Sequence, residues 1–168
     1  MENVKNFVNK YLDAAKAASN ESGIDYRIIL TQAGLESTYG QFAFKNNFFG
    51  FKTGKNWTGK KQLLKTFEES KNPNLKFPEI ISITPKVVKG DTIYVYRIRD
   101  WFRAYDTPLE GFLDHGRTLS SNKRYAVAMS FKNDPERFFI EIKKAGYATD
   151  FNYTKKLNAV YQNILIHL

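Results

Sequence analysis

The chain has 168 residues, of which 42% are hydrophobic and 15% aromatic, and it contains no cysteine. This length supports one sizeable hydrophobic core, so we predict a single domain spanning residues 1–168. The lack of cysteine excludes a disulfide framework, a thiol nucleophile and a cysteine-ligated metal, while the net charge of +9 favours a polyanionic partner such as nucleic acid, a membrane surface or bacterial cell wall.

The first forty residues predict two helices. Apolar residues recur at helical spacing from Val4 to Ala18, which is typical of an amphipathic helix. A second helix is expected after Asp25, because its carboxylate can accept hydrogen bonds from the free N–H groups of the first turn. We expect this helix to run to about Tyr39 and to end at Gly40, since glycine adopts the left-handed conformation at little cost.

The middle of the chain predicts a loop followed by a small β region. Residues 41–60 are rich in Asn, Gly, Phe and Lys without a sustained period, which indicates an irregular loop of the kind that often carries functional residues. Strands are then expected near residues 62–67, 80–83 and 93–98. Three prolines interrupt the region and predict strands that are short or confined to sheet edges: Pro73, Pro78 and Pro85.

The rest of the chain predicts helices with clear start signals. Residues 107–110, Thr-Pro-Leu-Glu, form a capping box with proline at the first helical position. Residues 134–135, Asp-Pro, open another helix that we expect to stop at Gly146. A short helix near residues 125–131 and a closing helix over residues 157–168 complete the chain. Helices, a small β region and then helices indicate an α+β fold.

Glu36 is the first candidate for chemistry. It lies in the last turn of the second predicted helix and borders that helix's apolar stripe. A carboxylate there meets the negative end of the helix dipole, and partial burial would add desolvation, so we expect its pKa to be raised. A general acid at neutral pH needs such a pKa. From position alone, a solvated glutamate on a frayed helix end is the favoured alternative.

Short motifs around and after Glu36 change that balance. In chain order they occupy residues 35–40 with 46–52, 66–68, 102–105, 122–125 and 146–150, and they read LESTYG with NNFFGFK, TFE, FRAY, NKRY and GYATD. In this order they resemble the signature of glycoside hydrolase family 73, endo-β-N-acetylglucosaminidases of bacteria and phages. The resemblance covers nearly the whole chain. It implies a lysozyme-like α+β fold, with a mainly helical lobe and a small β-hairpin lobe flanking the substrate groove.

The resemblance also implies roles for single residues. Glu36 would be the catalytic acid and Glu68 the second acidic position, a pair that suits glycosidic cleavage. Tyr147 matches a tyrosine implicated in orienting the acetamido group of the substrate. The substrate-binding candidates are residues that could stack on sugar rings or bond to amides, and they are Tyr39, Asn47, Phe49 and Tyr125.

Several alternatives stay open for these residues. Glu69 would point to the opposite strand face from Glu68, so a one-residue shift would exchange their roles. Glu68 is equally explained as an exposed hairpin charge, Tyr147 as a packing aromatic and the binding candidates as core, Phe49 especially. Cleavage could proceed by inversion with Glu68 as base, or with the substrate's own acetamido group as nucleophile.

The chain departs from the family pattern at three places. Tyr39 stands where tryptophan is common, which keeps an aromatic ring available. Phe151 follows the GYATD motif where proline is usual, a departure that affects the local turn and leaves Tyr147 in place. Residues 70–92 lengthen the β region, and this insertion either extends the β lobe over the groove or is a decoration.

The leading hypothesis is therefore hydrolysis of the β-1,4 bond after N-acetylglucosamine in peptidoglycan. The alternatives are an N-acetylmuramidase or lytic transglycosylase using the same groove, a noncatalytic wall-binding or phage tail module, and a nucleic-acid binder. Neither His115 nor His167 has metal-spaced neighbours, so we predict no metal and no cofactor.

The expected partner is peptidoglycan, with no nucleic acid and no membrane insertion, and we expect a monomer. The N-terminus shows no signal peptide. We therefore expect a protein made in the cytoplasm that acts on the cell wall, as an antimicrobial phage endolysin or virion enzyme, or as a fragment of an exported bacterial enzyme.

Overall fold

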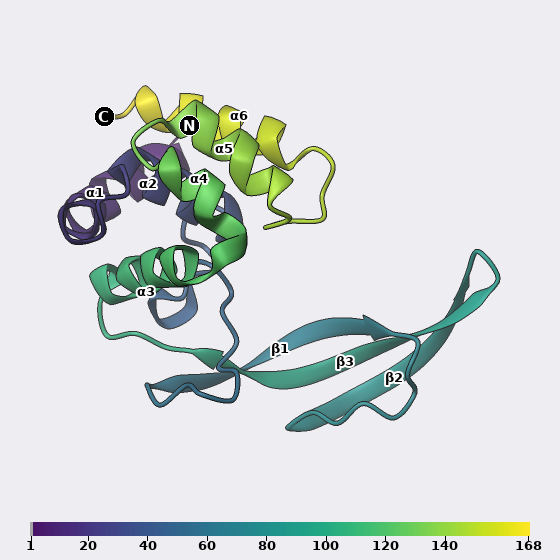
Figure 1. The fold of residues 1–168 in the computed structure, drawn as a ribbon. Helices are drawn as coiled ribbons and strands as arrows, with labels where there is room; N and C mark the ends of the chain where they lie inside the picture. The colour runs from purple at the N-terminus through teal and green to yellow at the C-terminus, as the bar shows by residue number, and fades with distance from the viewer. Residues whose placement is uncertain (1) are drawn as a thin grey trace. The chain divides into compact units, whose positions relative to one another are not determined.

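The computed structural model describes residues 2–168, which divide into two compact units (Figure 1). The helical unit contains the chain up to Gly50 together with Tyr105–Leu168, and the β unit contains Phe51–Ala104. Helices and an antiparallel sheet therefore occupy separate parts of the sequence, which confirms the predicted α+β class.

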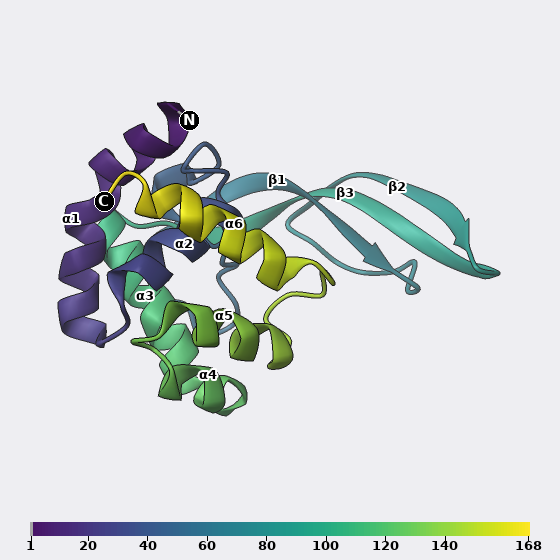
Figure 2. The same cartoon turned by 90° about the horizontal axis from the view of Figure 1, so that it is seen from above.

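The helical unit is built around one short central helix. In chain order its elements are α1 (Glu2–Ser22), α2 (Tyr26–Glu36), the 3₁₀ turn η1 (Phe44–Asn46), α3 (Pro108–Ser121), the 3₁₀ turn η2 (Lys123–Tyr125), α4 (Ala126–Ser130), α5 (Pro135–Lys144) and α6 (Tyr153–Leu165). Helix α2 contacts α1, α5 and α6, and Figure 2 shows it among the other helices. Its residues from Ile28 to Gly34 are all buried, as expected for a helix that is covered on every side.

Helix α2 ends earlier than the sequence predicts. It stops at Glu36, and Thr38 and Tyr39 already have positive φ angles of 50° and 53°. The hydroxyl of Ser37 donates to the Ala33 carbonyl, which also accepts from the Ser37 N–H, and it accepts from the Gly40 N–H, which in a continuing helix would donate to the Glu36 carbonyl. The expected end at Tyr39 was therefore wrong, and Glu36 becomes the last helical residue.

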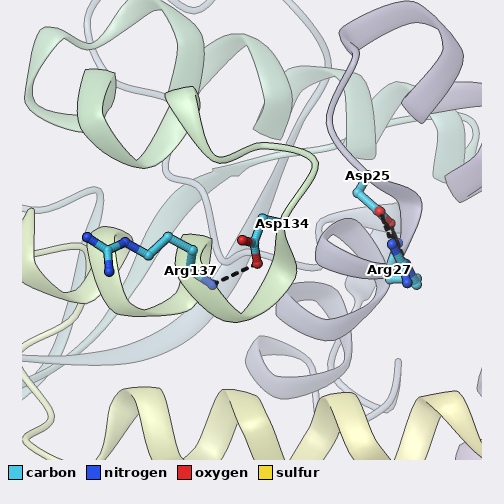
Figure 3. Close-up of polar contacts among 4 residues, drawn as sticks. All are labelled: Asp25, Arg27, Asp134 and Arg137. Atoms are coloured by element: carbon cyan, nitrogen blue, oxygen red, sulfur yellow. Dashed lines mark hydrogen bonds and ion pairs between the residues drawn. The ribbon is translucent and has the colours of Figure 1, made fainter.

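The predicted helix starts are confirmed by their side-chain caps. The Asp25 carboxylate accepts from the Arg27 N–H at 2.8 Å, and the Asp134 carboxylate accepts from the Arg137 N–H at 3.1 Å (Figure 3). Thr107 caps α3 in the same way. Each bond satisfies one of the N–H groups that a helix leaves without an internal partner, which explains why these three starts could be read from sequence.

The β unit is a three-stranded antiparallel sheet. Its strands are β1 (Lys61–Ser70), β2 (Glu79–Val88) and β3 (Asp91–Arg103), in the order β1-β3-β2. The strands contain 10, 10 and 13 residues, so they are not short, and the other predicted outcome holds, because Pro85 lies in the edge strand β2. Pro85 is tolerated because β2 lies at the sheet edge, where a strand bonds on one side only. The segment 70–92 supplies β2 and both of its turns.

Within residues 2–168, none of the helices combines the length and the apolar character that crossing a membrane would require.

Candidate active site

A pocket of about 470 Å³ opens on the helical unit where α2 ends. Two segments line it, the end of α2 and the stretch that leads into α6: Leu35, Glu36, Tyr147, Ala148, Thr149, Asp150, Tyr153 and Lys156. The pocket thus brings together Glu36 and Tyr147, two of the three residues predicted to be catalytic. They are separated by more than a hundred residues in sequence, and the packing of α2 against α6 unites them.

The carboxyl group of Glu36 lies at the boundary between protein and solvent. The side chain is exposed, yet Tyr153 donates a hydrogen bond to its Oε1 at 2.7 Å. Desolvation by neighbouring protein atoms raises the pKa of Glu36, and the bond from Tyr153 opposes this rise without cancelling it. A raised pKa favours the protonated form that a general acid needs.

Tyr153 is a site residue that sequence reasoning missed. It is the first residue of α6 and is only 4% exposed, and its ring centroid lies 5.9 Å from that of Tyr147. The closing helix was predicted from Leu157 onward, so Tyr153 fell in the preceding loop. Its position three residues after Asp150, at the end of the GYATD motif, is the signal that could have identified it.

An aromatic cluster continues from the pocket into the core. The ring of Tyr147 lies 5.8 Å from that of Tyr125, and its hydroxyl is 3.5 Å from Nε2 of His115. His115 stacks on Phe49 with centroids 3.8 Å apart. Complete burial lowers the pKa of His115 to about 3, so its ring is neutral at ordinary pH. Phe49 and Tyr125 do not line the pocket themselves. Their connection to Glu36 is indirect, through side-chain contacts with His115, Tyr147 and Tyr153.

Burial also keeps the phenol of Tyr147 in its neutral form. Desolvation, with a smaller contribution from the charge of Glu36, raises the pKa of Tyr147 well above its ordinary value. Its hydroxyl can therefore both donate and accept a hydrogen bond, which is what contact with an amide group requires.

The loop that carries Asn47 is fixed to the start of α3. The side chain of Asn46 donates to the Tyr105 carbonyl at 3.1 Å, and the Tyr105 N–H donates to the Lys45 carbonyl at 3.0 Å. Asn47 follows directly and is buried. The close approach depends on Gly111, because a Cβ at that position would lie 2.3 Å from the Asn46 carbonyl oxygen.

Replacing Gly111 with alanine should therefore displace this loop. We expect the free energy of unfolding to fall by about 1–3 kcal/mol, as for other overpacked positions, because the clashing atom belongs to the backbone. Urea unfolding followed by circular dichroism would measure the change. Gly116→Ala in the same helix is the matched control, since its nearest contact is the Ser22 side chain at 3.3 Å. Equal stability of the two variants would contradict the steric argument.

Tyr39 does not line the Glu36 pocket. It lines a separate pocket of about 220 Å³ together with residues of α1. Its ring makes an edge contact with Phe7 at 5.9 Å, and its hydroxyl accepts from the Asn163 side chain at 3.4 Å. The change of backbone direction after Glu36 carries Tyr39 to this position.

Glu68 belongs to the β unit, on β1. Nζ of Lys52 lies 2.5 Å from its carboxylate and 2.8 Å from that of Asp100, so one lysine bridges two acids. Burial lowers the pKa of Lys52, but the bonds to Asp100 and Glu68 outweigh this effect and the net shift is upward. Lys52 therefore remains charged and holds the Glu68 carboxylate in place.

The neighbouring Glu69 has a different environment. Glu68 pairs with the buried Tyr96 across the sheet and is half-buried, whereas Glu69 is exposed and pairs with Lys86 at 2.5 Å. Successive residues of β1 therefore face opposite sides of the sheet, as the alternation of a strand requires. These positions favour Glu68 over Glu69 as the residue held in a defined polar cluster.

Comparison with known proteins agrees with this description. The model of the glucosaminidase family, described as mannosyl-glycoprotein endo-β-N-acetylglucosaminidase, matches residues 12–165. The chain is 32% identical over 164 residues to the peptidoglycan hydrolase FlgJ of Vibrio cholerae, and 30% identical over 166 residues to that of Vibrio parahaemolyticus. These alignments cover 94% and 95% of the chain but 43% and 47% of the relatives, so the chain spans less than half of their length.

Solved structures share the same fold. A C-terminally truncated glycoside hydrolase domain of FlgJ from Salmonella typhimurium superposes with a TM-score of 0.69 and 29% identity, over 97% of this chain and 98% of that one. The catalytic domain of the autolysin Auto from Listeria monocytogenes gives a TM-score of 0.71 at 21% identity, over 99% of this chain and 87% of that one, and so agrees in fold.

An α+β fold shared with these domains, together with an acidic side chain in an open pocket, defines the chain as a glycoside hydrolase. It belongs to the glucosaminidase family, glycoside hydrolase family 73.

Proposed function

We propose that this domain hydrolyses the β-1,4 bond after N-acetylglucosamine in peptidoglycan, with Glu36 as the general acid. The observation that carries the proposal is the position of Glu36 at the end of α2, in an open pocket, with its pKa raised and one oxygen held by Tyr153. The relatives named peptidoglycan hydrolase support peptidoglycan as the glycan.

The geometry gives Glu36 a defined way to act. The hydroxyl of Tyr153 occupies Oε1, so Oε2 is the oxygen that can present a proton to the pocket. As the bond between the anomeric carbon and the leaving oxygen breaks, Glu36 transfers this proton to the leaving oxygen. Water then adds to the anomeric carbon and loses a proton, and Glu36 is protonated again from solvent.

Two routes are open for the attack on the anomeric carbon. In the inverting route, Glu68 removes a proton from the attacking water, and Lys52 keeps the Glu68 carboxylate oriented. In the substrate-assisted route, the acetamido oxygen attacks first, and the neutral Tyr147 hydroxyl at the pocket wall orients that group. The first route inverts the anomeric configuration and the second retains it, so proton NMR of the first product formed separates them.

The identity of the new reducing end tests the bond that is cleaved. Purified peptidoglycan would be digested, the fragments reduced with borohydride, and their ends identified by mass spectrometry. We expect reduced N-acetylglucosamine. Reduced N-acetylmuramic acid would identify a muramidase, anhydro ends would identify a lytic transglycosylase, and no release of fragments by a protein that still binds the wall would leave a noncatalytic module.

We propose the bacterial cell wall as the place of action, with the domain acting as a monomer. The relatives come from bacteria, which supports a wall enzyme of bacterial origin. A phage lysis or virion enzyme would meet the same substrate. Neither nucleic acid nor a membrane is part of the proposed activity.

A further inference from the structure

The positive charge of the chain is concentrated in the β unit. Residues 51–104 contain twelve Lys or Arg and five Asp or Glu, a net charge of +7 out of +9 for the whole chain. The helical unit, although twice as long, therefore carries only +2. Charge that served only solubility would be spread over the whole surface. Its concentration in one third of the sequence therefore indicates a role for the β unit itself.

Much of this charge lies on one face of the sheet. The register places Lys65 opposite Arg99, Phe67 opposite Arg97 and Leu63 opposite Trp101. Lys61 is two residues from Leu63 on the same face, and its Nζ lies 4.3 Å from the Trp101 ring centroid. We call this surface the basic face, and its residues are Lys61, Leu63, Lys65, Phe67, Arg97, Arg99 and Trp101. Two acids share it, Glu69 and Glu79, and each is paired with a cation, Lys86 and Arg99 respectively.

Three cations of the basic face have no acid to neutralise them. Arg99 is paired with Glu79 at 2.8 Å. Among residues 2–168, no carboxylate lies within ion-pair distance of the other three, which are Lys61, Lys65 and Arg97. Like charges opposite each other weaken a sheet, and the Lys65 and Arg99 pair is of this kind. Phe67, which lies opposite Arg97 and two residues after Lys65, is 66% exposed.

We infer that the basic face binds the carboxylates of the peptide stems of peptidoglycan, so that the β unit recognises the peptide part of the polymer whose glycan is cleaved. The inference rests on the proposed function. Stem peptides combine carboxylates with small apolar side chains. On the basic face, cations alternate with Leu63, Phe67 and Trp101 at about 6.8 Å along a strand and about 5 Å across strands, a spacing that an extended peptide shares.

The test compares binding to two forms of the wall. Proteins would carry Glu36→Gln to prevent digestion, and binding would be measured by sedimentation with intact peptidoglycan and with glycan strands freed of stems by an amidase. Replacing Lys61, Lys65 and Arg97 together with glutamine should weaken binding to intact peptidoglycan about tenfold. Binding to the stem-free strands should be weak and equal for both proteins.

Two further variants separate a specific face from net charge. Glutamine at Lys5, Lys10 and Lys155 removes three exposed charges from the helical unit and should leave binding unchanged. Lys61→Arg, Lys65→Arg and Arg97→Lys keep the charge and should retain binding, which also controls for folding. An equal loss in the helical-unit variant, or wild-type binding by the glutamine variant of the basic face, would overturn the inference. The inference would also be overturned if the glutamine variant of the basic face lost binding to DNA but kept binding to peptidoglycan.

The same variants keep this inference distinct from the proposed activity. On stem-free glycan, the basic-face variant without the Glu36 change should cleave at the wild-type rate. Absence of cleavage by wild type would reject the proposed activity, whereas the binding comparison would still decide whether the basic face recognises stems.

Discussion

Glu36→Gln is expected to lower kcat for glycan cleavage by about 10³-fold, because the amide cannot donate the proton that the leaving oxygen needs. The substitution preserves the size of the side chain and its acceptor for Tyr153, so the fold and substrate binding should be unaffected. Release of reducing ends from peptidoglycan would measure the rate, and sedimentation with the insoluble polymer would measure binding.

Glu21→Gln is the matched control for this prediction. Glu21 is an exposed glutamate near the end of α1, it does not line the Glu36 pocket, and its replacement should leave kcat unchanged. If Glu36→Gln retained more than a tenth of wild-type kcat, Glu36 could not be the principal acid. A parallel fall in thermal stability would instead attribute the loss of activity to unfolding.

The second large effect is expected for Tyr153→Phe. Its hydroxyl stabilises the charged form of Glu36, so its removal should raise the pKa of Glu36 further. Activity requires protonated Glu36 and is lost as the pH rises through this pKa. The alkaline limb of the pH profile should therefore move to higher pH in the variant. Loss of orientation should also lower kcat, by about 10- to 100-fold for one lost bond to a charged group.

Tyr161→Phe controls for the loss of a buried phenol. Tyr161 lies two turns further along α6 and is buried, but it is not part of the pocket. Its substitution should leave both kcat and the pH profile unchanged. If Tyr153→Phe lowered kcat without moving the alkaline limb, Tyr153 would have only a structural role. If both variants behaved alike, the bond to Glu36 would have no special importance.

Local signals explain which parts of the fold were predictable. Asp25, Thr107 and Asp134 make bonds within three residues of themselves, so the starts of three helices could be read directly. The end of α2 could not be predicted in this way. It depends on the Ser37 hydroxyl, which donates a hydrogen bond to one backbone group and accepts one from another. A competition of this kind leaves no periodic trace in the sequence.

The site was predictable to a similar extent. Glu36 and Tyr147 share a pocket, as their motifs led us to expect, whereas Tyr39 lies elsewhere because the backbone reverses after α2. Tyr153 was missed, and His115 was considered only as a metal ligand, because their contacts in the site arise from tertiary packing, which a residue outside a motif does not reveal. The prolines left two outcomes open, short strands or edge strands, and the structure shows the second for Pro85, because sequence alone does not reveal which strand will be an edge.

The bonds between Lys45, Asn46 and Tyr105 have a consequence for how this domain can vary. The chain leaves the helical unit after Gly50 and returns at Tyr105, and Lys45 and Asn46, shortly before the exit, are held to Tyr105 by hydrogen bonds of 3.0 and 3.1 Å. The cost of closing a longer excursion grows only with the logarithm of its length, by about 0.6 kcal/mol per doubling. The intervening segment can therefore be lengthened, trimmed or exchanged in evolution and in engineering while the helical scaffold that carries Glu36 stays the same.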